Sequence, residues 1–364
     1  MRVLIAAGGT GGHIYPGIAV AHEVMRRDPA SKIRFVGTAR GLENRLVPNA
    51  GFELSLIESQ GLKNVGAIAR VKGLLVLPQS LLAARRVIRE FRPDIVVGAG
   101  GYVSGPVLLA ASLMRRPTMV MDSNALPGFT NRRLARFVDR AAVSFTEALP
   151  YFRGKGVLTG NPVRAEFFEI AAKPHDAERI SLLVFGGSQG ARAINEAMVS
   201  ALPKLGAHKH RLSITHQTGA PDLEKTQRGY IDAGWDANVE VKAYIDDMVS
   251  EFSQADLIIS RAGATTTAEL LAAGKAAVMI PFPLAADDHQ RKNAEALEIA
   301  GAAKMILQKD LNGDRLAAEL IALLEAPEQI AAMEAAARKL GRRDAAKATV
   351  DLMEELIQSK KKII

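Results

Sequence analysis

The sequence contains no cysteine among its 364 residues. This absence excludes disulfide bonds, zinc sites built from thiolates and a cysteine nucleophile, and it suits a reducing cytoplasm. The chain begins directly with an apolar strand pattern and lacks the layout of a signal peptide. No Asp-x-Asp pair occurs, and the seven histidines lack the spacing of a zinc protease. We therefore expect no cofactor and no dedicated metal site.

Long uncharged segments are also scarce. The longest covers residues 95–114, which is long enough to cross a membrane. It contains four glycines and one proline, at Gly98, Gly100, Gly101, Gly105 and Pro106. We interpret it as a strand, a glycine loop and a helix rather than as a membrane span.

The net charge of +8 is concentrated in one region. Residues 60–140 contain 13 Lys or Arg against 4 Asp or Glu, a net charge of +9. Such a concentration favours contact with nucleic acid or with an anionic membrane surface, although a solubilising face would have the same composition.

Apolar runs and helical patterns alternate almost throughout the chain, which is longer than one core usually supports. We expect strands at 3–7, 33–37, 95–99, 118–121 and 141–144, and then at 180–185, 212–217, 239–243, 257–260, 276–280 and 304–307. Helices are expected at 16–27, 81–91, 191–202, 266–273 and 288–300. This alternation predicts an α/β fold with two Rossmann-like domains, whose parallel sheets bind ligands at the carboxyl ends of their strands. We place the domains at 1–160 and 161–342, and we expect a helix in 343–364 to pack back on the first.

Two glycine-rich turns of the same kind are the most informative feature of the sequence. Gly8–His13 follows the strand pattern at 3–7, and Gly186–Ala191 follows the one at 180–185. A strand, a glycine turn and a helix start together present backbone N–H groups and a positive dipole end, which suits phosphate. We therefore expect two similar domains that face each other across a cleft.

The first turn lacks the G-x-G-x-x-G fingerprint, the acidic residue that binds a nicotinamide ribose and the G-K-[ST] of a P-loop. His13 closes this turn at a helix start, where the dipole favours the neutral imidazole. A neutral histidine that faces a cleft can act as a general base. The alternative is a structural hydrogen bond to the loop.

Other polar motifs also follow expected strands. Gly100–Pro106 can hold a second phosphate or form a plain tight turn. Glu269 can accept hydrogen bonds from both hydroxyls of a ribose or compensate the helix dipole. Gln290 and Asn293 share one helical face and could bind sugar hydroxyls. Arg164 and Ser188 suit a diphosphate.

An apolar segment with flanking bases lies inside the basic region. Its residues are Leu74, Leu75, Leu77, Leu81, Leu82, Arg85 and Arg86. Such a patch can enter a membrane interface while its bases meet anionic lipid, or it can be an ordinary buried helix face. We favour the membrane interpretation.

Taken together, these motifs resemble the MurG family of peptidoglycan glycosyltransferases over essentially the whole chain. The matching segments are Gly8–His13, Gly100–Pro106, Gly160–Arg164, Gly186–Ala191, Ile245–Met248, Arg261–Glu269 and Asp287–Asn293, in the family's order. The resemblance implies a B-type glycosyltransferase fold. It also implies inverting transfer of N-acetylglucosamine from UDP-GlcNAc to undecaprenyl-diphosphate-linked N-acetylmuramyl-pentapeptide in cell-wall synthesis.

The resemblance assigns the acceptor to the N-terminal domain and the sugar nucleotide to the C-terminal one. It implies a catalytic role for His13. Substrate contacts would come from Thr10, Gly11, Gly12, Asn124, Arg164, Ser188, Ile245, Ala264, Thr265, Glu269, Gln290 and Asn293. The acceptor diphosphate would meet Gly100, Gly101, Tyr102 and Ser104. We expect peripheral binding to the anionic cytoplasmic face of the cell membrane, other cell-wall synthesis proteins as further partners, and no nucleic acid.

One segment departs from the family pattern. Where the family often has His-Glu-Gln-Asn, this chain has Met121-Asp122-Ser123-Asn124, which affects the expected acceptor contacts. The alternatives are another B-type nucleotide-sugar enzyme, such as a glycolipid transferase or a UDP-GlcNAc epimerase, a nicotinamide oxidoreductase, and a non-catalytic membrane scaffold.

Overall fold

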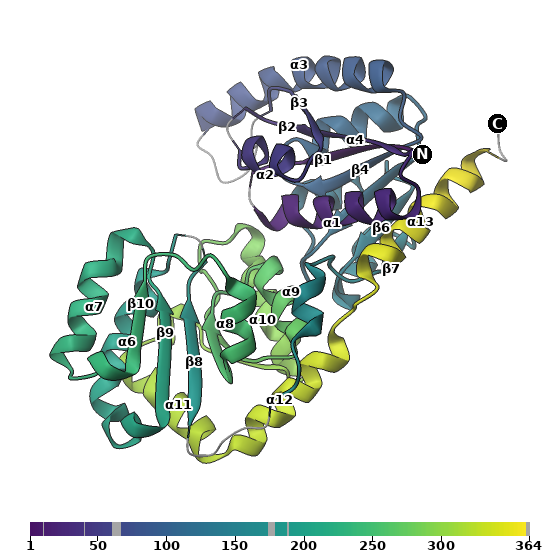
Figure 1. Cartoon of the computed structure of the whole chain (residues 1–364). Helices are drawn as coiled ribbons and strands as arrows, with labels where there is room; N and C mark the ends of the chain where they lie inside the picture. Colours follow the sequence, from purple (N-terminus) through teal and green to yellow (C-terminus); the bar gives the residue numbers. More distant parts are fainter. Residues whose placement is uncertain (10, 40, 60–66, 174–178, 188, 362–364) are drawn as a thin grey trace. The chain divides into compact units, whose positions relative to one another are not determined.

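The computed structural model describes residues 1–361 except for 10, 40, 60–66, 174–178 and 188. The chain forms two compact units, shown in Figure 1. Unit 1 contains Met1–Val163 and the segment that begins at Arg342, and unit 2 contains Arg164–Gly341. The chain therefore passes from unit 1 to unit 2 and returns.

Unit 1 is built on a parallel sheet with the strand order β3-β2-β1-β4-β5-β6-β7 among the described residues. Its strands are β1 (Arg2–Ala7), β2 (Lys32–Gly37), β3 (Glu53–Leu56), β4 (Ile95–Gly100), β5 (Thr118–Asp122), β6 (Arg140–Val143) and β7 (Gly156–Leu158). Every residue of β4 is buried, as expected for a central parallel strand covered on both faces. The helices are α1 (Gly11–Arg27), α2 (Glu43–Asn49), α3 (Ala67–Phe91), α4 (Ser104–Leu113), α5 (Phe129–Leu134) and α13 (Ala345–Lys361).

Unit 2 repeats the plan with the strand order β10-β9-β8-β11-β12-β13. The strands are β8 (Ile180–Phe185), β9 (Leu212–Gln217), β10 (Val239–Lys242), β11 (Leu257–Ser260), β12 (Ala276–Met279) and β13 (Ala303–Met305). The α-helices are α6 (Arg192–Leu205), α7 (Leu223–Asp232), α8 (Met248–Gln254), α9 (Ala264–Ala273), α10 (His289–Ile299), α11 (Gly313–Glu325) and α12 (Pro327–Leu340). The two parallel α/β units confirm the predicted fold class.

The last helix, α13, belongs to the core of unit 1. Val350, Met353 and Ile357 are buried in one cluster with residues of α1 and the sheet. Arg27, near the end of α1, also forms an ion pair with Asp351 at 2.7 Å. The apolar face of α13 thus completes the layer on this side of the sheet.

Several elements differ from the sequence expectation. The strands β3 and β7, which have four and three residues and lie at the edges of the sheet, were not predicted. Helix α1 begins at Gly11 instead of residue 16, so the end of the first glycine turn is already helical. Helix α3 begins at Ala67 and therefore includes the predicted membrane segment.

Candidate functional site

In unit 1, two glycine loops lie at the carboxyl ends of the adjacent parallel strands β1 and β4. A Cβ atom on Gly101 would lie 2.2 Å from the carbonyl oxygen of Gly8, and one on Gly100 would lie 2.2 Å from Nδ1 of His13. Both positions also have positive φ, of +115° at Gly100 and +79° at Gly101. Only glycine allows this approach, which places the imidazole of His13 directly against the second loop.

The other predicted residues of these loops have different surroundings. Ser104 is fully buried, and its hydroxyl accepts a hydrogen bond from the N–H of Gly100 and lies within bonding distance of the Ala6 and Gly100 carbonyls. It therefore supports the loop from within the fold. Tyr102 has 58% of its surface exposed. Thr10 lies outside the described residues.

A buried carboxylate that the sequence analysis missed holds the first glycine loop. Glu43, at the start of α2, accepts hydrogen bonds from the N–H of Gly9 at 2.9 Å and from the N–H and hydroxyl of Thr38 at 2.8 and 2.9 Å. Burial opposes ionisation of Glu43, but these bonds outweigh it and lower the pKa of the carboxyl. The loop is thus tied to an ionised side chain.

The segment that departs from the family pattern spans the last two residues of β5 and the turn that follows. Met121 is a buried core residue. Asp122 accepts hydrogen bonds from the N–H groups of Asn124 and Gly128 and from the amide of Asn131. Burial raises the pKa of Asp122, although these bonds oppose the shift. Asp122 therefore acts as a brace for the backbone at Asn124.

In unit 2, the second glycine loop joins β8 to α6 and packs on the loop that follows β9. A Cβ atom on Gly190 would lie 1.8 Å from the carbonyl oxygen of Thr218, and the φ of Gly190 is +73°. The carbonyl of Gly187 accepts hydrogen bonds from the N–H of Gly190 and from the side-chain amide of Gln217, each at 2.9 Å. Ser188 lies outside the described residues.

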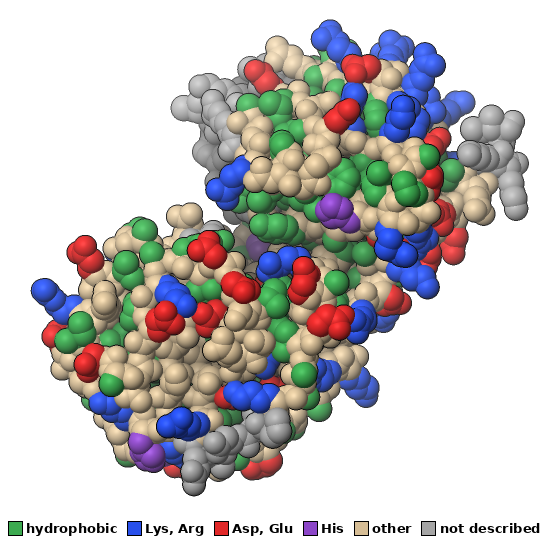
Figure 2. All heavy atoms as spheres, in the orientation of Figure 1, with side chains coloured by type: hydrophobic (Ala, Val, Ile, Leu, Met, Phe, Trp, Pro, Cys, Tyr) green, Lys and Arg blue, Asp and Glu red, His purple; other side chains and the backbone are tan. Residues whose placement is uncertain are grey.

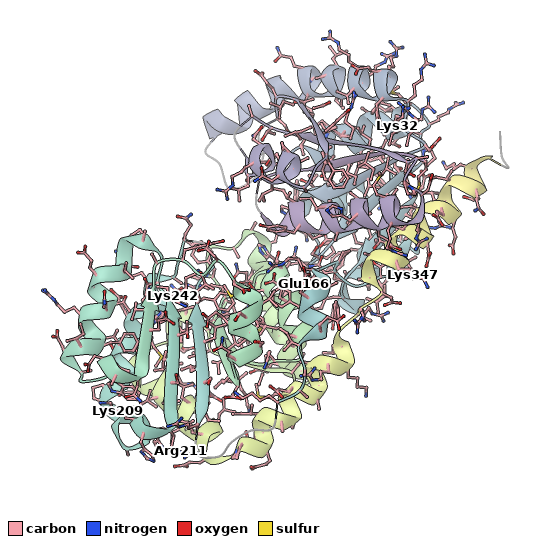
Figure 3. The ribbon with its side chains drawn as sticks, in the orientation of Figure 1. Lys32, Glu166, Lys209, Arg211, Lys242 and Lys347 are labelled. Carbon is pink, nitrogen blue, oxygen red and sulfur yellow. The ribbon has the colours of Figure 1, made fainter. Side chains whose placement is uncertain are left out.

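The predicted base-binding residue Ile245 lies in the loop between β10 and α8. Its side chain is buried, and its N–H donates a hydrogen bond to Oε1 of Gln217 at 2.8 Å. Lys242 of β10, labelled in Figure 3, forms an ion pair with Glu251 of α8 at 2.9 Å, which braces the two elements around this loop.

Arg164 and Glu269, both predicted from the sequence, meet in unit 2. Nη2 of Arg164 lies 3.7 Å from Oε1 of Glu269, and the guanidinium stacks on Phe167 at 4.8 Å from the ring centre. Burial raises the pKa of Glu269 to about 7, although Arg164 opposes the shift. The carboxyl group therefore changes charge close to neutral pH.

The start of α9 carries further predicted residues. The N-cap, Gly263, provides no side-chain cap, and Ala264 and Thr265 begin the helix at the positive end of its dipole. The Thr265 hydroxyl is buried and has no hydrogen-bond partner in the described part of the chain. A buried polar atom of this kind is compatible with a bound ligand group.

Gln290 and Asn293 lie on α10 but are not equivalent. Oε1 of Gln290 accepts the N–H of Phe282 at 3.0 Å. Asn293 is fully buried, and its amide donates to the carbonyl of Ala262 at 3.1 Å. Asp287 and Asp288, the two residues just before α10, have positive φ values of +57° and +56°, a sparsely populated conformation that clusters at functional sites.

A buried histidine network lies at the carboxyl end of β9 in unit 2. Nδ1 of His216 lies 2.9 Å from the Tyr230 hydroxyl, and Nε2 lies 3.0 Å from Oδ1 of Asn195. The Asn195 amide nitrogen donates to the Thr218 carbonyl, so its oxygen faces His216 and requires a proton on Nε2. Burial lowers the pKa of His216 to about 3, which keeps the ring neutral.

The predicted membrane patch lies on α3, where Figure 2 shows Lys and Arg side chains gathered. Leu82 has 65% of its surface exposed, and Arg85 and Arg86 are exposed beside it. Leu77 and Leu81 are half-buried. The side chains of Leu74 and Leu75 lie outside the described part of the structure.

In the described ranges, no helix has the length and apolar character needed to cross a membrane. The same part of the chain holds no group of three or more His, Cys, Asp or Glu residues placed to bind a metal ion.

Two parallel α/β units with glycine loops at the carboxyl ends of their first strands define a glycosyltransferase of the B type. Residues 3–143 match the glycosyltransferase family 28 N-terminal domain, and residues 181–349 match the C-terminal domain of that family. The chain belongs to glycosyltransferase family 28.

Relatives that match over nearly the full length define the group more closely. A UDP-N-acetylglucosamine–N-acetylmuramyl-(pentapeptide) pyrophosphoryl-undecaprenol N-acetylglucosamine transferase of Anaeromyxobacter sp. (strain Fw109-5) is 49% identical over 98% of this chain and 94% of its own length. Its counterpart from Myxococcus xanthus (strain DK1622) is 48% identical over 98% and 93%. The predicted resemblance to an N-acetylglucosaminyltransferase family is thus confirmed.

Two solved structures have the same fold over nearly the whole chain. Acinetobacter baumannii MurG superposes with a TM-score of 0.80 at 33% identity, over 97% of this chain and 99% of that one. A UDP-GlcNAc 2-epimerase from Neisseria meningitidis, bound to UDP-GlcNAc, superposes with a TM-score of 0.69 at 16% identity, over 98% of this chain and 100% of that one. At that identity the second likeness shows the fold alone.

Proposed function

We propose that this protein transfers N-acetylglucosamine from UDP-GlcNAc to the 4-hydroxyl of undecaprenyl-diphosphate-linked N-acetylmuramyl-pentapeptide, with inversion. Full-length similarity to transferases named for this reaction supports the substrates. The pairing of Glu269 with Arg164 carries the assignment of the donor to unit 2, because it places a carboxylate for ribose hydroxyls beside a cation for phosphate.

The donor diphosphate would bind where unit 2 offers positive groups. The guanidinium of Arg164, the first turn of α9 and the N–H groups of the second glycine loop are all suited to an anion. Ile245 would contact the uracil through its backbone, and Gln290 would contact the sugar. Asn293, being fully buried, would act by holding the start of α9 through Ala262.

Unit 1 would supply the acceptor site and the general base, His13. The acceptor 4-hydroxyl oxygen attacks the anomeric carbon of N-acetylglucosamine, the bond from that carbon to the β-phosphate oxygen breaks, and UDP leaves. The hydroxyl proton passes to His13, whose place at the start of α1 favours the neutral ring. The charge that develops on the β-phosphate is stabilised by the groups of unit 2.

The site on the acceptor side would include Gly100, Gly101 and Tyr102, with Asn124 held by Asp122. Because the acceptor carries a long lipid, the enzyme would work at the cytoplasmic face of the membrane. The exposed Leu82 and the arginines of α3 support a peripheral contact with anionic lipid.

The test is transfer of labelled N-acetylglucosamine from UDP-GlcNAc to a short-chain analogue of the lipid-linked muramyl-pentapeptide, with and without EDTA. We expect labelled glycolipid that requires the acceptor and forms in both conditions. Absence of product, with UDP-GlcNAc binding intact, would refute the acceptor assignment. Conversion of UDP-GlcNAc without any acceptor would instead identify an epimerase.

A further inference from the structure

Gln217 occupies a central position in unit 2 that the reaction described above does not use. It is the last residue of β9, which lies between β8 and β10 in the sheet, and it pairs with Phe185, the last residue of β8. The second glycine loop follows β8, and the loop that contains Ile245 follows β10. Gln217 therefore ends its strand between two loops that are both predicted to contact the donor.

The side chain of Gln217 bonds to both loops at once. Its Nε2 donates to the carbonyl of Gly187 at 2.9 Å, and its Oε1 accepts the N–H of Ile245 at 2.8 Å. The residue is 1% exposed, so the two bonds are protected from water. One planar amide offers a donor and an acceptor at a fixed separation, so it sets the spacing between the two backbone segments.

The backbone just before Ile245 is also tied to the residues that follow β9, by main-chain hydrogen bonds and by the Thr218 hydroxyl, which donates to the Lys242 carbonyl at 3.4 Å. The N–H of Thr218 donates to the Lys242 carbonyl, and the N–H of Gly219 donates to the Ala243 carbonyl. These bonds end two residues before Ile245. Gln217 extends the connection to Ile245, the residue predicted to contact the uracil. It also links Ile245 to the second glycine loop, which is predicted to contact the diphosphate.

The bond to Gly187 also has an electrostatic consequence. A carbonyl oxygen that faced a diphosphate would repel it. The Gly187 carbonyl instead accepts hydrogen bonds from Gln217 and from the N–H of Gly190, so the protein occupies both of its acceptor positions. Loss of the Gln217 donor would free this oxygen to approach an anion.

We propose that Gln217 is a positioning residue for the uridine diphosphate part of the donor, because its side chain joins the glycine loop to the Ile245 loop. This inference rests on the proposed function for the identity of the donor. It adds a residue that touches no reacting atom and acts through the two loops it connects.

Two variants of Gln217 distinguish its bond to Gly187 from its bond to Ile245. Gln217→Glu keeps the shape and the acceptor for Ile245 but removes the donor for Gly187 and adds a charge. Gln217→Met removes both bonds at similar volume. The matched control is Asn238→Leu, because the Asn238 amide bonds to the Leu212 carbonyl at the opposite end of β9.

The measurements are the Kd of UDP by calorimetry, the KM values of UDP-GlcNAc and acceptor, and the Tm of each full-length protein. We expect both Gln217 variants to weaken UDP binding and to raise the UDP-GlcNAc KM by about tenfold or more, the effect of losing one well-placed hydrogen bond to a binding loop. The acceptor KM should stay unchanged. The control should lower Tm and leave UDP binding unchanged.

A pH series adds a readout that a purely structural role would not move. When the carboxyl of Gln217→Glu is protonated, its O–H can donate to Gly187 again, so the ratio of its UDP Kd to that of the wild type should fall toward one as the pH is lowered. A neutral Gln217→Met variant should show no such recovery.

The inference is overturned if folded Gln217→Glu protein binds UDP as the wild type does, or if Asn238→Leu weakens UDP binding equally. If the wild type and variants show the expected UDP affinities but no glycolipid forms, the inference holds and the proposed acceptor is wrong. A wild type that binds no UDP would refute both.

Discussion

The two glycine loops share one layout but are held by opposite kinds of side chain. In unit 1, the ionised carboxylate of Glu43 accepts a hydrogen bond from the N–H of Gly9. In unit 2, the neutral amide of Gln217 donates a hydrogen bond to the carbonyl of Gly187. In the first loop, the bond occupies an N–H group that could otherwise bind an anion, and it places a negative charge beside the loop. In the second loop, the bond occupies a carbonyl oxygen that would otherwise repel an anion.

This difference indicates a division of labour between loops that look alike in the sequence. In the proposed function, the second loop would bind the donor diphosphate, and Arg164 in the same unit would add a positive charge. The first loop is better suited to fix the position of His13, which packs on Gly100. The following predictions test this division, from the largest expected effect to the smallest.

Replacing the histidine should give the largest effect. We expect His13→Ala to lower kcat by about 100-fold or more, the usual contribution of a general base, and to leave the Kd of UDP-GlcNAc unchanged. Turnover and calorimetry measure the two quantities. His22→Ala, an exposed histidine on the same helix, is the control. Equal turnover of His13→Ala and wild type would remove His13 from the mechanism.

Protonation of Glu269 should weaken the donor site. Its pKa of about 7 in the free protein means that the carboxylate is lost as the pH falls below that value, and with it the proposed acceptor for the ribose hydroxyls. We expect the Kd of UDP-GlcNAc to rise by about tenfold per pH unit on the acidic side. Glu269→Gln should bind weakly and without this dependence. A flat Kd profile for the wild type would show that the ribose does not need an ionised Glu269.

Removing the charge of Glu43 should affect the other substrate. Glu43→Gln replaces one acceptor oxygen by a donor that faces N–H groups, so we expect a loss of about 2 kcal/mol in the free energy of unfolding. The acceptor KM should rise while the UDP-GlcNAc KM stays unchanged. Urea unfolding and steady-state kinetics test this, with the exposed Glu53→Gln as control. A change confined to the UDP-GlcNAc KM would contradict the division of labour.

At neutral pH, the smallest effect concerns the histidine network of unit 2. The pKa of His216 is about 3 in the folded state against the ordinary histidine value of 6.5, so the unfolded chain takes up a proton first as the pH falls. Stability should therefore decrease below about pH 6.5, by up to about 1.4 kcal/mol per pH unit. His216→Gln keeps the hydrogen bonds in principle and should show a flatter profile in urea unfolding. Parallel profiles for both proteins would show that another group is responsible.

The sequence predicted the elements whose signal is local. Each glycine loop was recognised because a buried strand, a glycine turn and a helix follow one another directly. The edge strands β3 and β7 were not predicted, although the equally short edge strands β10 and β13 were. Ser104 and Asn293 were chosen by position in a motif, but only the packed structure shows that both are buried.

The residues that hold the loops could not be predicted in this way. Glu43 lies 34 residues from its partner Gly9, and Gln217 lies 30 residues from Gly187. Their contacts arise only when parallel strands bring separate loops together at one edge of a sheet. A polar residue at the very end of a buried strand, as at Gln217, is the signal that could have found one of them. The substrate contacts assigned to the site residues stay predictions.

The return of the chain to unit 1 has a consequence for how the protein is made. The cluster that α13 completes with Ile18 and Val24 of α1 lacks the side chains of this helix until residues 345–361 have left the ribosome. Unit 2, a continuous segment from Arg164 to Gly341, contains all its own strands by then. Synthesis therefore favours a fixed order, in which the later unit closes its core first and the unit that begins the chain is the last to become complete.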